Sequence, residues 1–353
     1  MPIVSAINSA KSTIEIAIFR FDQREIERAL AHAVSRGVAV HALIAHVNSS
    51  GEESLRKLEM RLLAAGVTVA RTGGDFARYH YKLLIVDHSE LYLLAFNFTH
   101  HDMNRSRSFG LVIDDRKLVQ EAIKLFQADV QRQSYEPGVP GFVVSPENAR
   151  SLLAAFLSGA QTELLIYDPK ISDPAMLGLL KDRCEAGLDL KVIGQVSSGG
   201  AKLMARKLSN LNLHARVMIR DRQSAFVGSQ SLREIELDGR REAGIIFEDR
   251  EIVKELTKTF EEDWELAQPV DDHDAASAAK VAKRIAKAVT KELPPLAPLL
   301  EATIKEIAGD RTPVDLDARQ VEETVTEAVR EAVKEAVQEA VEQAEQKTLH
   351  TAS

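Results

Sequence analysis

The sequence predicts an α/β protein built from two pseudo-symmetric halves, followed by a helical C-terminal tail. A strand–helix–strand pattern near the start of the chain returns 150 residues later. A short motif of histidine, a cation and aspartate also occurs twice, once in each expected half. Beyond residue 268 the composition shifts to alanine, valine, lysine and glutamate, which favours isolated helices over a packed α/β body.

The first repeat relates residues 10–44 to residues 160–194. Each segment reads as a strand, an amphipathic helix, a glycine and a second strand, and the two glycines are Gly37 and Gly187. Such a βαβ unit requires parallel strands joined by a right-handed crossover. The repeat therefore predicts the same unit at the start of both halves.

The second repeat is H-x-K-x4-D, which occurs as HYKLLIVD (80–87) and, with arginine in place of lysine, as HARVMIRD (214–221). Side chains alternate between the faces of a strand, so the histidine and the cation of each copy point the same way. An imidazole beside a cation suits an anion whose central atom can be attacked. One copy alone would be better explained as an ordinary strand histidine, but two copies in matched contexts indicate catalysis. The motif residues are His80, Lys82, Asp87, His214, Arg216 and Asp221.

The similarity between the halves continues beyond the motifs. The matched segments are 93–99 with 227–233, and 109–115 with 243–249, followed by predicted closing helices at 115–133 and 249–266. The second half has 16 fewer residues between its βαβ glycine and its motif, so we expect a shorter connection there. Pseudo-twofold pairing of the halves would bring both motifs to one cleft.

Proline and glycine residues mark the connection between the halves. The segment SYEPGVPG, residues 134–141, breaks both helix and strand. We therefore expect one half at 1–135, the other at 142–268, and a partly disordered helical tail at 269–353.

The net charge of −8 is distributed unevenly. Residues 271–353 hold 17 acidic and 11 basic residues, so the body before them carries only −2. A body this close to neutral lacks the basic excess of a dedicated nucleic-acid binder. Ten basic residues near the motifs are either solvated strand ends or a positive rim for a phosphate substrate: Arg71, Arg78, Lys82, Arg105, Arg107, Arg216, Arg220, Arg222, Arg240 and Arg241.

Cysteine usage and the first residues bear on the compartment. The single cysteine, Cys184, excludes an internal disulfide framework and fits a reducing environment. The chain begins without a signal-peptide pattern, and no stretch is apolar enough to span a bilayer. We expect a cytoplasmic protein for which peripheral membrane contact stays open.

The two motifs and the segments after them resemble the phospholipase D superfamily, and the resemblance covers residues 5–266. It implies two halves, each with a mixed sheet flanked by helices, that meet at one active site. It also implies a metal-free, cofactor-free, two-step reaction at a phosphodiester. Activities of the family include head-group hydrolysis of phospholipids, phosphatidyl transfer and cleavage of DNA or RNA.

The resemblance also assigns roles to the motif residues. His80 would attack phosphorus and form a phosphohistidine, while His214 would protonate the leaving oxygen and then activate the incoming water or alcohol. General chemistry supports these roles. Covalent catalysis splits one hard displacement into two easier ones. Imidazole titrates near neutral pH, so one ring can be neutral and attack while the other is protonated and donates. Lys82 and Arg216 would neutralise the non-bridging oxygens in the transition state.

Five further residues receive supporting roles. Asp87 and Asp221 are expected to hold the strand-to-turn geometry rather than to touch the substrate. Ser229 matches the family serine that binds phosphate, and Asn97 stands at the matching asparagine of the first half. Glu242 matches the acidic residue that orients an imidazole.

The sequence departs from the family pattern in both halves. Arg216 replaces the usual lysine, which keeps the charge but changes reach. In the first half, Leu94 and Ala95 replace Gly-Ser, and Ser108 stands where a glutamate is expected. Ser231 replaces the second asparagine, so we expect an asymmetric site.

One acidic and histidine-rich segment follows the first motif. His100, His101 and Asp102 superficially suggest metal ligands, but they are adjacent rather than spaced for one ion. We interpret them as a loop just past a strand.

The tail contains two predicted helices of opposite charge. Residues 275–293 form a basic amphipathic helix, and residues 319–347 form an acidic helix with valine at every fourth position. These helices either associate with another copy, a partner helix or an anionic lipid surface, or remain weakly ordered.

Three functions remain open from the sequence. The first is a phospholipase D-type phosphodiesterase or phosphatidyltransferase acting on phospholipid head groups, which the near-neutral body and the basic helix favour. The second is a metal-independent nuclease with nucleic acid as substrate. The third is a degenerate member that binds phosphate polymers or membranes without turnover, and the intact His80 and His214 argue against it.

Overall fold

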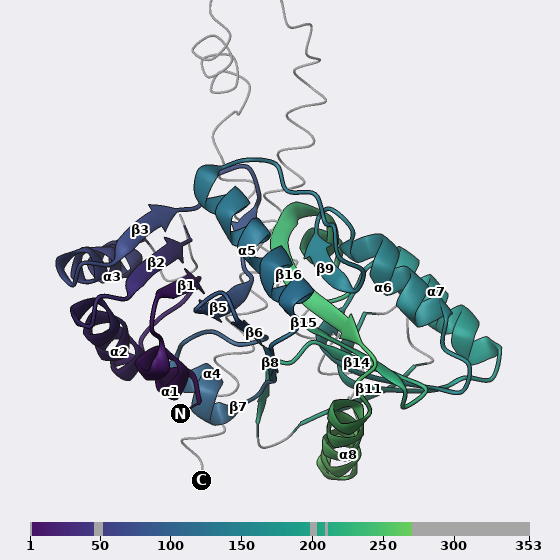
Figure 1. Cartoon of the computed structure of the whole chain (residues 1–353). Helices are drawn as coiled ribbons and strands as arrows, with labels where there is room; N and C mark the ends of the chain where they lie inside the picture. The colour runs from purple at the N-terminus through teal and green to yellow at the C-terminus, as the bar shows by residue number, and fades with distance from the viewer. Residues whose placement is uncertain (1, 46–51, 198–202, 209–210, 270–353) are drawn as a thin grey trace, which may run out of the picture. The chain divides into compact units, whose positions relative to one another are not determined.

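A computed structural model describes residues 2–45, 52–197, 203–208 and 211–269 (Figure 1). All of them belong to one unit that ends at Pro269. The two predicted tail helices lie outside the described residues. No helix in these four ranges is both long and apolar enough to cross a membrane.

The first half contains a mixed sheet in which six strands are described, in the order β3-β2-β1-β5-β6-β8. β1 pairs with β2, and β2 with β3, in parallel, whereas the remaining neighbours are antiparallel. The strands are β1 (Thr13–Ile18), β2 (Ala39–Ile44), β3 (Thr68–Arg71), β5 (Lys82–Val86), β6 (Glu90–Leu94) and β8 (Gly110–Ile113).

The second half repeats this arrangement, with described strands in the order β17-β12-β11-β10-β14-β15-β16-β4 and with β9 beside β16. Its strands are β9 (Phe142–Ser145), β10 (Glu163–Ile171), β11 (Asp189–Val196), β12 (Met204–Lys207), β14 (Val217–Arg220), β15 (Ser224–Gly228), β16 (Arg240–Phe247) and β17 (Gln268–Pro269). β4 (Arg78–Tyr79) comes from the first half and immediately precedes its motif histidine.

The predicted βαβ repeat is confirmed in both halves. Thr13 on β1 faces Ala39 on β2, and Glu163 on β10 faces Asp189 on β11, both in parallel ladders. The two registers differ by the 150 residues that the sequence repeat indicated. The expected shorter connection is also present, because residues 45–67 with α3 link β2 to β3, whereas only residues 197–203 link β11 to β12.

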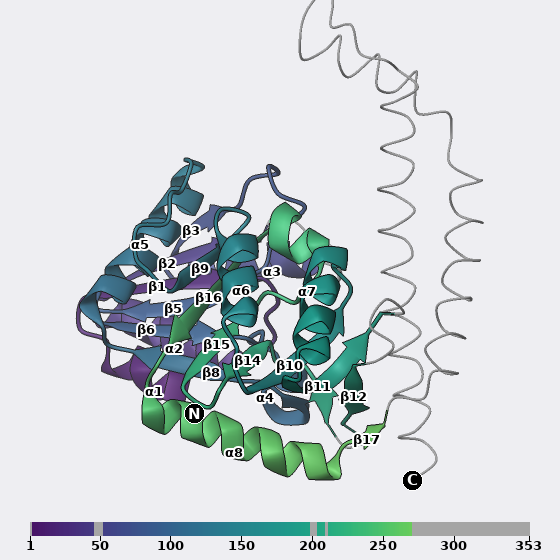
Figure 2. The ribbon, with the colours of Figure 1, turned by 90° about the vertical axis from the view of Figure 1, so that its right-hand side faces the viewer.

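Helices cover the outer faces of both sheets. α1, α2 and α3 lie beside the first sheet (Figure 1), and α6 and α7 lie over the second (Figure 2). The helices are α1 (Pro2–Ser9), α2 (Arg24–Ser35), α3 (Glu52–Ala64), α4 (His100–Arg105), α5 (Arg116–Gln131), α6 (Ala149–Ser158), α7 (Pro174–Glu185), the π-helical turn η2 (Ile235–Gly239) and α8 (Arg250–Leu266).

A shared apolar core joins the halves. It takes side chains from α5 and α8, such as Phe126 and Phe260, and from the inner faces of both sheets. The predicted closing helices are thus confirmed as α5 and α8, and each begins at an aspartate, Asp115 or Asp249, whose carboxylate caps backbone N–H groups of the first turn. Trp264 stacks on Phe260 at a ring distance of 5.9 Å and holds the end of α8 against this core.

Two short ladders connect the halves beside the motifs. β4 pairs with β16 in parallel just before His80, and β13 (Asn212–Leu213) pairs with β7 (Ser106–Arg107) in parallel just before His214. The two ladders are related by an offset of 134 residues in both of their strands. The pseudo-twofold relation therefore extends to the contacts between the halves.

Candidate active site

Each motif histidine is held by a strand of the other half. The His80 N–H donates to the Arg241 carbonyl at 2.8 Å, and the His214 N–H donates to the Arg107 carbonyl at 3.0 Å. The charges of Lys82 and Arg216 lower the pKa of both histidines. The structure therefore brings the two motifs together in one electrostatically connected site.

The same two arginines also form cross-half ion pairs, which we call the arginine clamps. Each arginine contacts an aspartate on the closing helix of the half whose histidine it holds. The pairs are Arg241 with Asp129 at 3.2 Å and Arg107 with Asp263 at 2.6 Å.

His80 has a charged partner on each ring nitrogen. Its Nδ1 lies 3.0 Å from both carboxylate oxygens of Glu242, and its Nε2 lies 2.9 Å from Nζ of Lys82. Only the tautomer with hydrogen on Nδ1 satisfies both contacts, because the carboxylate accepts and the ammonium donates. Nε2 therefore carries the lone pair of the ring.

Burial dominates the titration of this group of residues. It lowers the pKa of His80 well below its usual value, and the charges of Lys82, Arg240, Arg216 and Arg78 lower it further. Burial also lowers the pKa of Lys82 to about 7, against the opposing charge of Glu242. His80 is consequently a neutral base at physiological pH, as a nitrogen nucleophile must be.

Glu242 lies in the second half and is completely buried. Burial raises its pKa to about 7, and the nearby Glu236 adds to this effect. Ser229 lies next to it, with a hydroxyl that exchanges hydrogen bonds with the backbone of Ala243 and contacts the Glu242 carboxylate. Ser229 and Glu242 therefore lie together on the His80 side of the site.

His214 has different partners. Its Nδ1 lies 3.8 Å from Oδ2 of Asp102 and makes no hydrogen bond among the described residues. Burial and the Arg216 charge lower the pKa of His214 to about 3, whereas Asp102 opposes this shift. Arg216 lies beside it and donates to the His214 carbonyl and to the Ser231 hydroxyl, both at 3.3 Å.

Asp102 is the site residue that sequence reasoning missed. The predicted loop at 100–102 was wrong: these residues begin α4, whose first turn is capped by Thr99. The helix places the Asp102 carboxylate against Asn97, whose backbone N–H and side-chain amide both donate to it, at 2.9 and 2.7 Å. Burial alone would raise the pKa of Asp102, but His214 and the Asn97 hydrogen bonds lower it.

The offset of 134 residues relates Asp102 to Glu236, and each carboxylate accepts the N–H of the residue five positions earlier, Asn97 or Ser231. That shared spacing was the signal available in the sequence. The two carboxylates have diverged, because Glu236 pairs with Arg240 at 3.0 Å while Asp102 faces a histidine.

Asp87 and Asp221 lie at the far ends of the motif strands, roughly 16 Å along the strand from the cation of each motif. Each carboxylate accepts three consecutive backbone N–H groups, at residues 11–13 and at residues 161–163 respectively, with distances of 2.7 to 3.1 Å. Both residues have positive φ, 52° and 53°, at the tight turn after the strand. The structure therefore does not bring these two motif residues to the histidines.

Half of the ten basic rim residues face carboxylates. The pairs, besides the arginine clamps, are Arg71 with Glu59, Arg222 with Glu163 and Glu261, and Arg240 with Glu236. Arg78 and Arg240 also lie close enough to His80 to lower its pKa.

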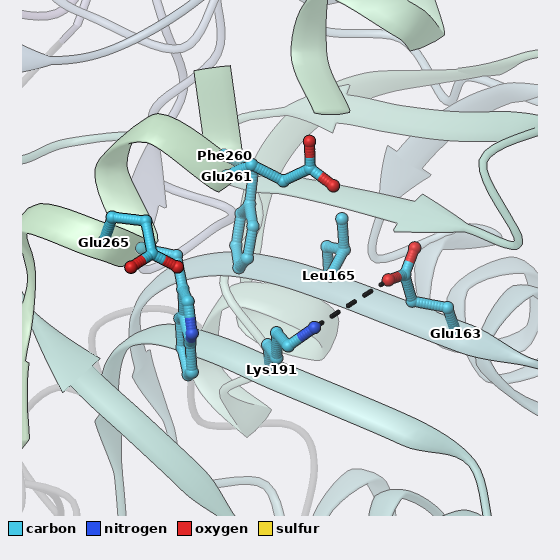
Figure 3. A pocket seen from close by; sticks show the side chains of 7 residues that line it. Glu163, Leu165, Lys191, Phe260, Glu261 and Glu265 are labelled. Atoms are coloured by element: carbon cyan, nitrogen blue, oxygen red, sulfur yellow. Dashed lines mark ion pairs between the residues drawn. The ribbon is translucent and has the colours of Figure 1, made fainter. Parts of the chain in front are cut away.

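A separate cavity of about 250 Å³ lies between α8 and the second sheet (Figure 3). Its walls include Trp264 and Glu265, and Lys191 and Glu163 form an ion pair at 3.9 Å beside it. None of its lining residues belongs to either motif, so the cavity is distinct from the candidate site. No group of three or more His, Cys, Asp or Glu side chains within the described ranges is arranged to hold a metal ion.

Comparison with known structures supports the fold. Polyphosphate kinase from Porphyromonas gingivalis is similar with a TM-score of 0.65 and 16% identity, covering 77% of this chain and 46% of the kinase. This chain therefore spans less than half of that protein. Phosphatidylserine synthase from Haemophilus influenzae Rd KW20 is similar with a TM-score of 0.58 and 11% identity, covering 76% of this chain and 84% of the synthase.

No curated protein matches the sequence. The family model described as "Cardiolipin synthase, PLD-like domain" matches residues 3–130 and 151–264, which are most of the two halves. Together with the duplicated fold and the paired motifs, this match establishes that the chain belongs to the phospholipase D superfamily.

Proposed function

We propose that this protein is a phosphodiesterase or phosphatidyltransferase that acts on phospholipid head groups through a covalent phosphohistidine on His80. The observation that carries the proposal is the pair of buried histidines with different carboxylate partners. His80 has its lone pair on Nε2 because Glu242 accepts from Nδ1. His214 has Asp102 beside its Nδ1, and the charge of Asp102 opposes the lowering of the His214 pKa by burial.

In the first step, Nε2 of His80 attacks phosphorus and the bond between phosphorus and the head-group oxygen breaks. Glu242 stabilises the positive charge that develops on the attacking ring. His214 gives its Nε2 proton to the departing oxygen, since its Nδ1 faces Asp102. The negative charge of a bound phosphodiester raises the pKa of His214 and makes this protonation accessible at neutral pH.

In the second step, His214 takes a proton from water or an alcohol, whose oxygen attacks phosphorus. The bond between phosphorus and His80 breaks, and both histidines return to their starting states. Lys82 and Arg216 remain beside the non-bridging oxygens throughout and neutralise them. Water as acceptor gives hydrolysis, and an alcohol gives phosphatidyl transfer.

The choice of phospholipid rests on two likenesses. The matching family model is described as a cardiolipin synthase domain, and the similar synthase from Haemophilus influenzae, named for phosphatidylserine, is covered over 84% of its length. The near-neutral charge of the body supports the same choice over nucleic acid, because nucleic-acid binders carry basic surfaces.

The test is release of the head-group alcohol from phosphatidylcholine and phosphatidylglycerol vesicles in EDTA, with single- and double-stranded DNA assayed in parallel. Wild-type protein should release alcohol, and His80→Asn and His214→Asn should abolish the release. His41→Asn, which changes an exposed histidine on β2, serves as the matched control. Full activity in either motif variant, complete loss in EDTA, or DNA cleavage without lipid turnover would overturn the proposal.

A further inference from the structure

Arg78 extends the motif face by one more position. It lies two residues before His80 and four before Lys82, and all three side chains contact the ring of Phe19. Arg78 is also the ladder partner of Arg240 on β16. Like charges in such cross-strand positions are unfavourable, and Glu236 offsets part of this cost by pairing with Arg240 at 3.0 Å.

The aromatic ring of Phe19 lies beneath this cluster. Phe19 is buried just after β1, and its ring meets the His80 ring edge-on at 4.8 Å. The guanidinium carbons of Arg78 and Arg20 lie 5.1 and 5.9 Å from the centre of the same ring. Both guanidinium groups therefore contact the ring that packs against His80, and the ring attracts them electrostatically.

One nitrogen of the Arg20 guanidinium lacks a hydrogen-bond acceptor. Its Nε is buried and makes no hydrogen bond among the residues that the structure describes. A buried guanidinium N–H without an acceptor is costly, and a phosphate oxygen is the acceptor that best matches the guanidinium fork.

The fold itself does not require arginines at these positions. In the second half the corresponding ladder pairs Asn212 with Ser106, which replace Arg78 and Arg240 at the offset of 134 residues. The residues at the places of Phe19 and Arg20 are Pro169 and Lys170, 150 residues later. The Phe19 ring and the pair of Arg78 and Arg240 therefore belong to the His80 side alone, whereas a cation at the place of Arg20 and the backbone pairing are common to both sides.

A single phosphodiester carries one negative charge, and Lys82 and Arg216 already suffice to neutralise it. We propose that Arg20 and Arg78, over the Phe19 ring, form a second anion site that binds a further phosphate of the substrate. This inference rests on the proposed function and narrows it to lipids whose head group carries a phosphate beyond the phosphodiester that His80 attacks.

The test compares two lipids that differ by this one phosphate, phosphatidylglycerol and phosphatidylglycerol phosphate, in vesicles of otherwise equal composition. Wild-type protein should show at least a ~10-fold higher kcat/KM for the second lipid, the range expected for hydrogen bonds to a charged group. Arg20→Gln and Arg78→Gln should each reduce this preference about 10-fold. Loss of the Arg78 charge also alters His80, but that effect is common to both lipids and cancels in the ratio.

Arg61→Gln is the matched control, because Arg61 forms a surface pair with Glu27 and should leave the ratio at the wild-type value. An unchanged ratio in Arg20→Gln and Arg78→Gln, or no wild-type preference, would overturn the second anion site while the proposed function stands. Turnover of neither lipid would instead reject the proposed function.

A binding measurement tests the site independently of turnover. Calorimetric titration should show tighter binding of pyrophosphate than of orthophosphate to wild-type protein, and Arg78→Gln should remove the difference. Equal binding of both anions by the wild type would reject the site. Binding of single-stranded DNA through the same arginines, without binding of either lipid, would reject the lipid assignment.

Discussion

Removal of the Asp102 charge should impair the general acid selectively. Asp102 lies 3.8 Å from His214, and both side chains are largely buried, at 10% and 18% exposure. At such a distance and an effective dielectric constant of about 20, two unit charges interact by roughly 4 kcal/mol. Since one pKa unit corresponds to about 1.36 kcal/mol, Asp102→Asn should lower the pKa of His214 by up to about three units.

The kinetic consequence follows from the role of proton donor that we propose for His214. Asp102→Asn should lower kcat about 100- to 1000-fold at neutral pH, within the range of general acid catalysis. The basic limb of the kcat–pH profile should move to lower pH, because the ring loses its proton earlier. Substrates whose leaving alcohol has a low pKa need no proton from His214. Asp102→Asn should therefore turn over such substrates at close to the wild-type rate.

A compensating change sharpens this test. Ser108 stands where the family places a glutamate, so Ser108→Glu in the Asp102→Asn background should bring back part of the rate and of the pH profile. Asp114→Asn removes a charge from an exposed position and serves as the control. Wild-type kcat in Asp102→Asn, or an equal loss for all leaving groups, would refute the role assigned to this carboxylate.

Further expectations concern the other parts of the molecule. Arg216→Ala should raise the transition-state barrier by about 2–4 kcal/mol and Arg216→Lys should be mild, and an unchanged kcat/KM in the alanine variant would reject the phosphate contact. Mass spectrometry after an acid-free quench should find the phosphoryl group on the peptide that contains His80, and a label on the other motif histidine would reverse the roles. Arg241→Met should lower the free energy of unfolding by about 3–5 kcal/mol at pH 8, because it leaves the Asp129 carboxylate buried without its partner. The loss should be smaller at pH 5, where Asp129, with its pKa raised to about 6, is neutral. Equal losses in urea unfolding at both pH values would contradict this. Residues 1–269 alone should keep turnover of a soluble substrate and lose oligomer mass or liposome binding, and loss of turnover would show that the tail belongs to the body.

The repeats predicted the architecture because the patterns behind them are local. Strand alternation, the glycines after the βαβ helices and the closing helices each depend on neighbouring residues, and two copies allowed each to be checked against the other. Family resemblance alone indicated that Glu242 orients an imidazole, and the structure pairs it with His80, which is 162 positions away in the chain.

Asp102 was missed because its histidine partner lies far away in the sequence. Its carboxylate faces His214 only because α4 forms and the ladder of β13 with β7 brings His214 across from the other half. Its sequence neighbours, two histidines, drew attention to metal binding instead. Comparing the five-residue spacing after Asn97 with that after Ser231 would have shown a carboxylate at the same place in each half.

The arginine clamps explain how a symmetric fold can hold an asymmetric site. Each clamp arginine makes two contacts with the other half. Its backbone carbonyl accepts from the histidine of that half, and its guanidinium pairs with the closing helix of that half, so neither half positions its own histidine alone. The histidines therefore stay in place when the side chains around them change. In the proposed mechanism, Glu242 orients the ring that attacks, and Asp102 opposes loss of the proton from the other ring. Arg78 stands where the second half has Asn212. The duplicated backbone thus fixes the positions of the two histidines, and the proposed mechanism assigns the choice of nucleophile, of proton donor and of substrate to the residues that differ between the halves.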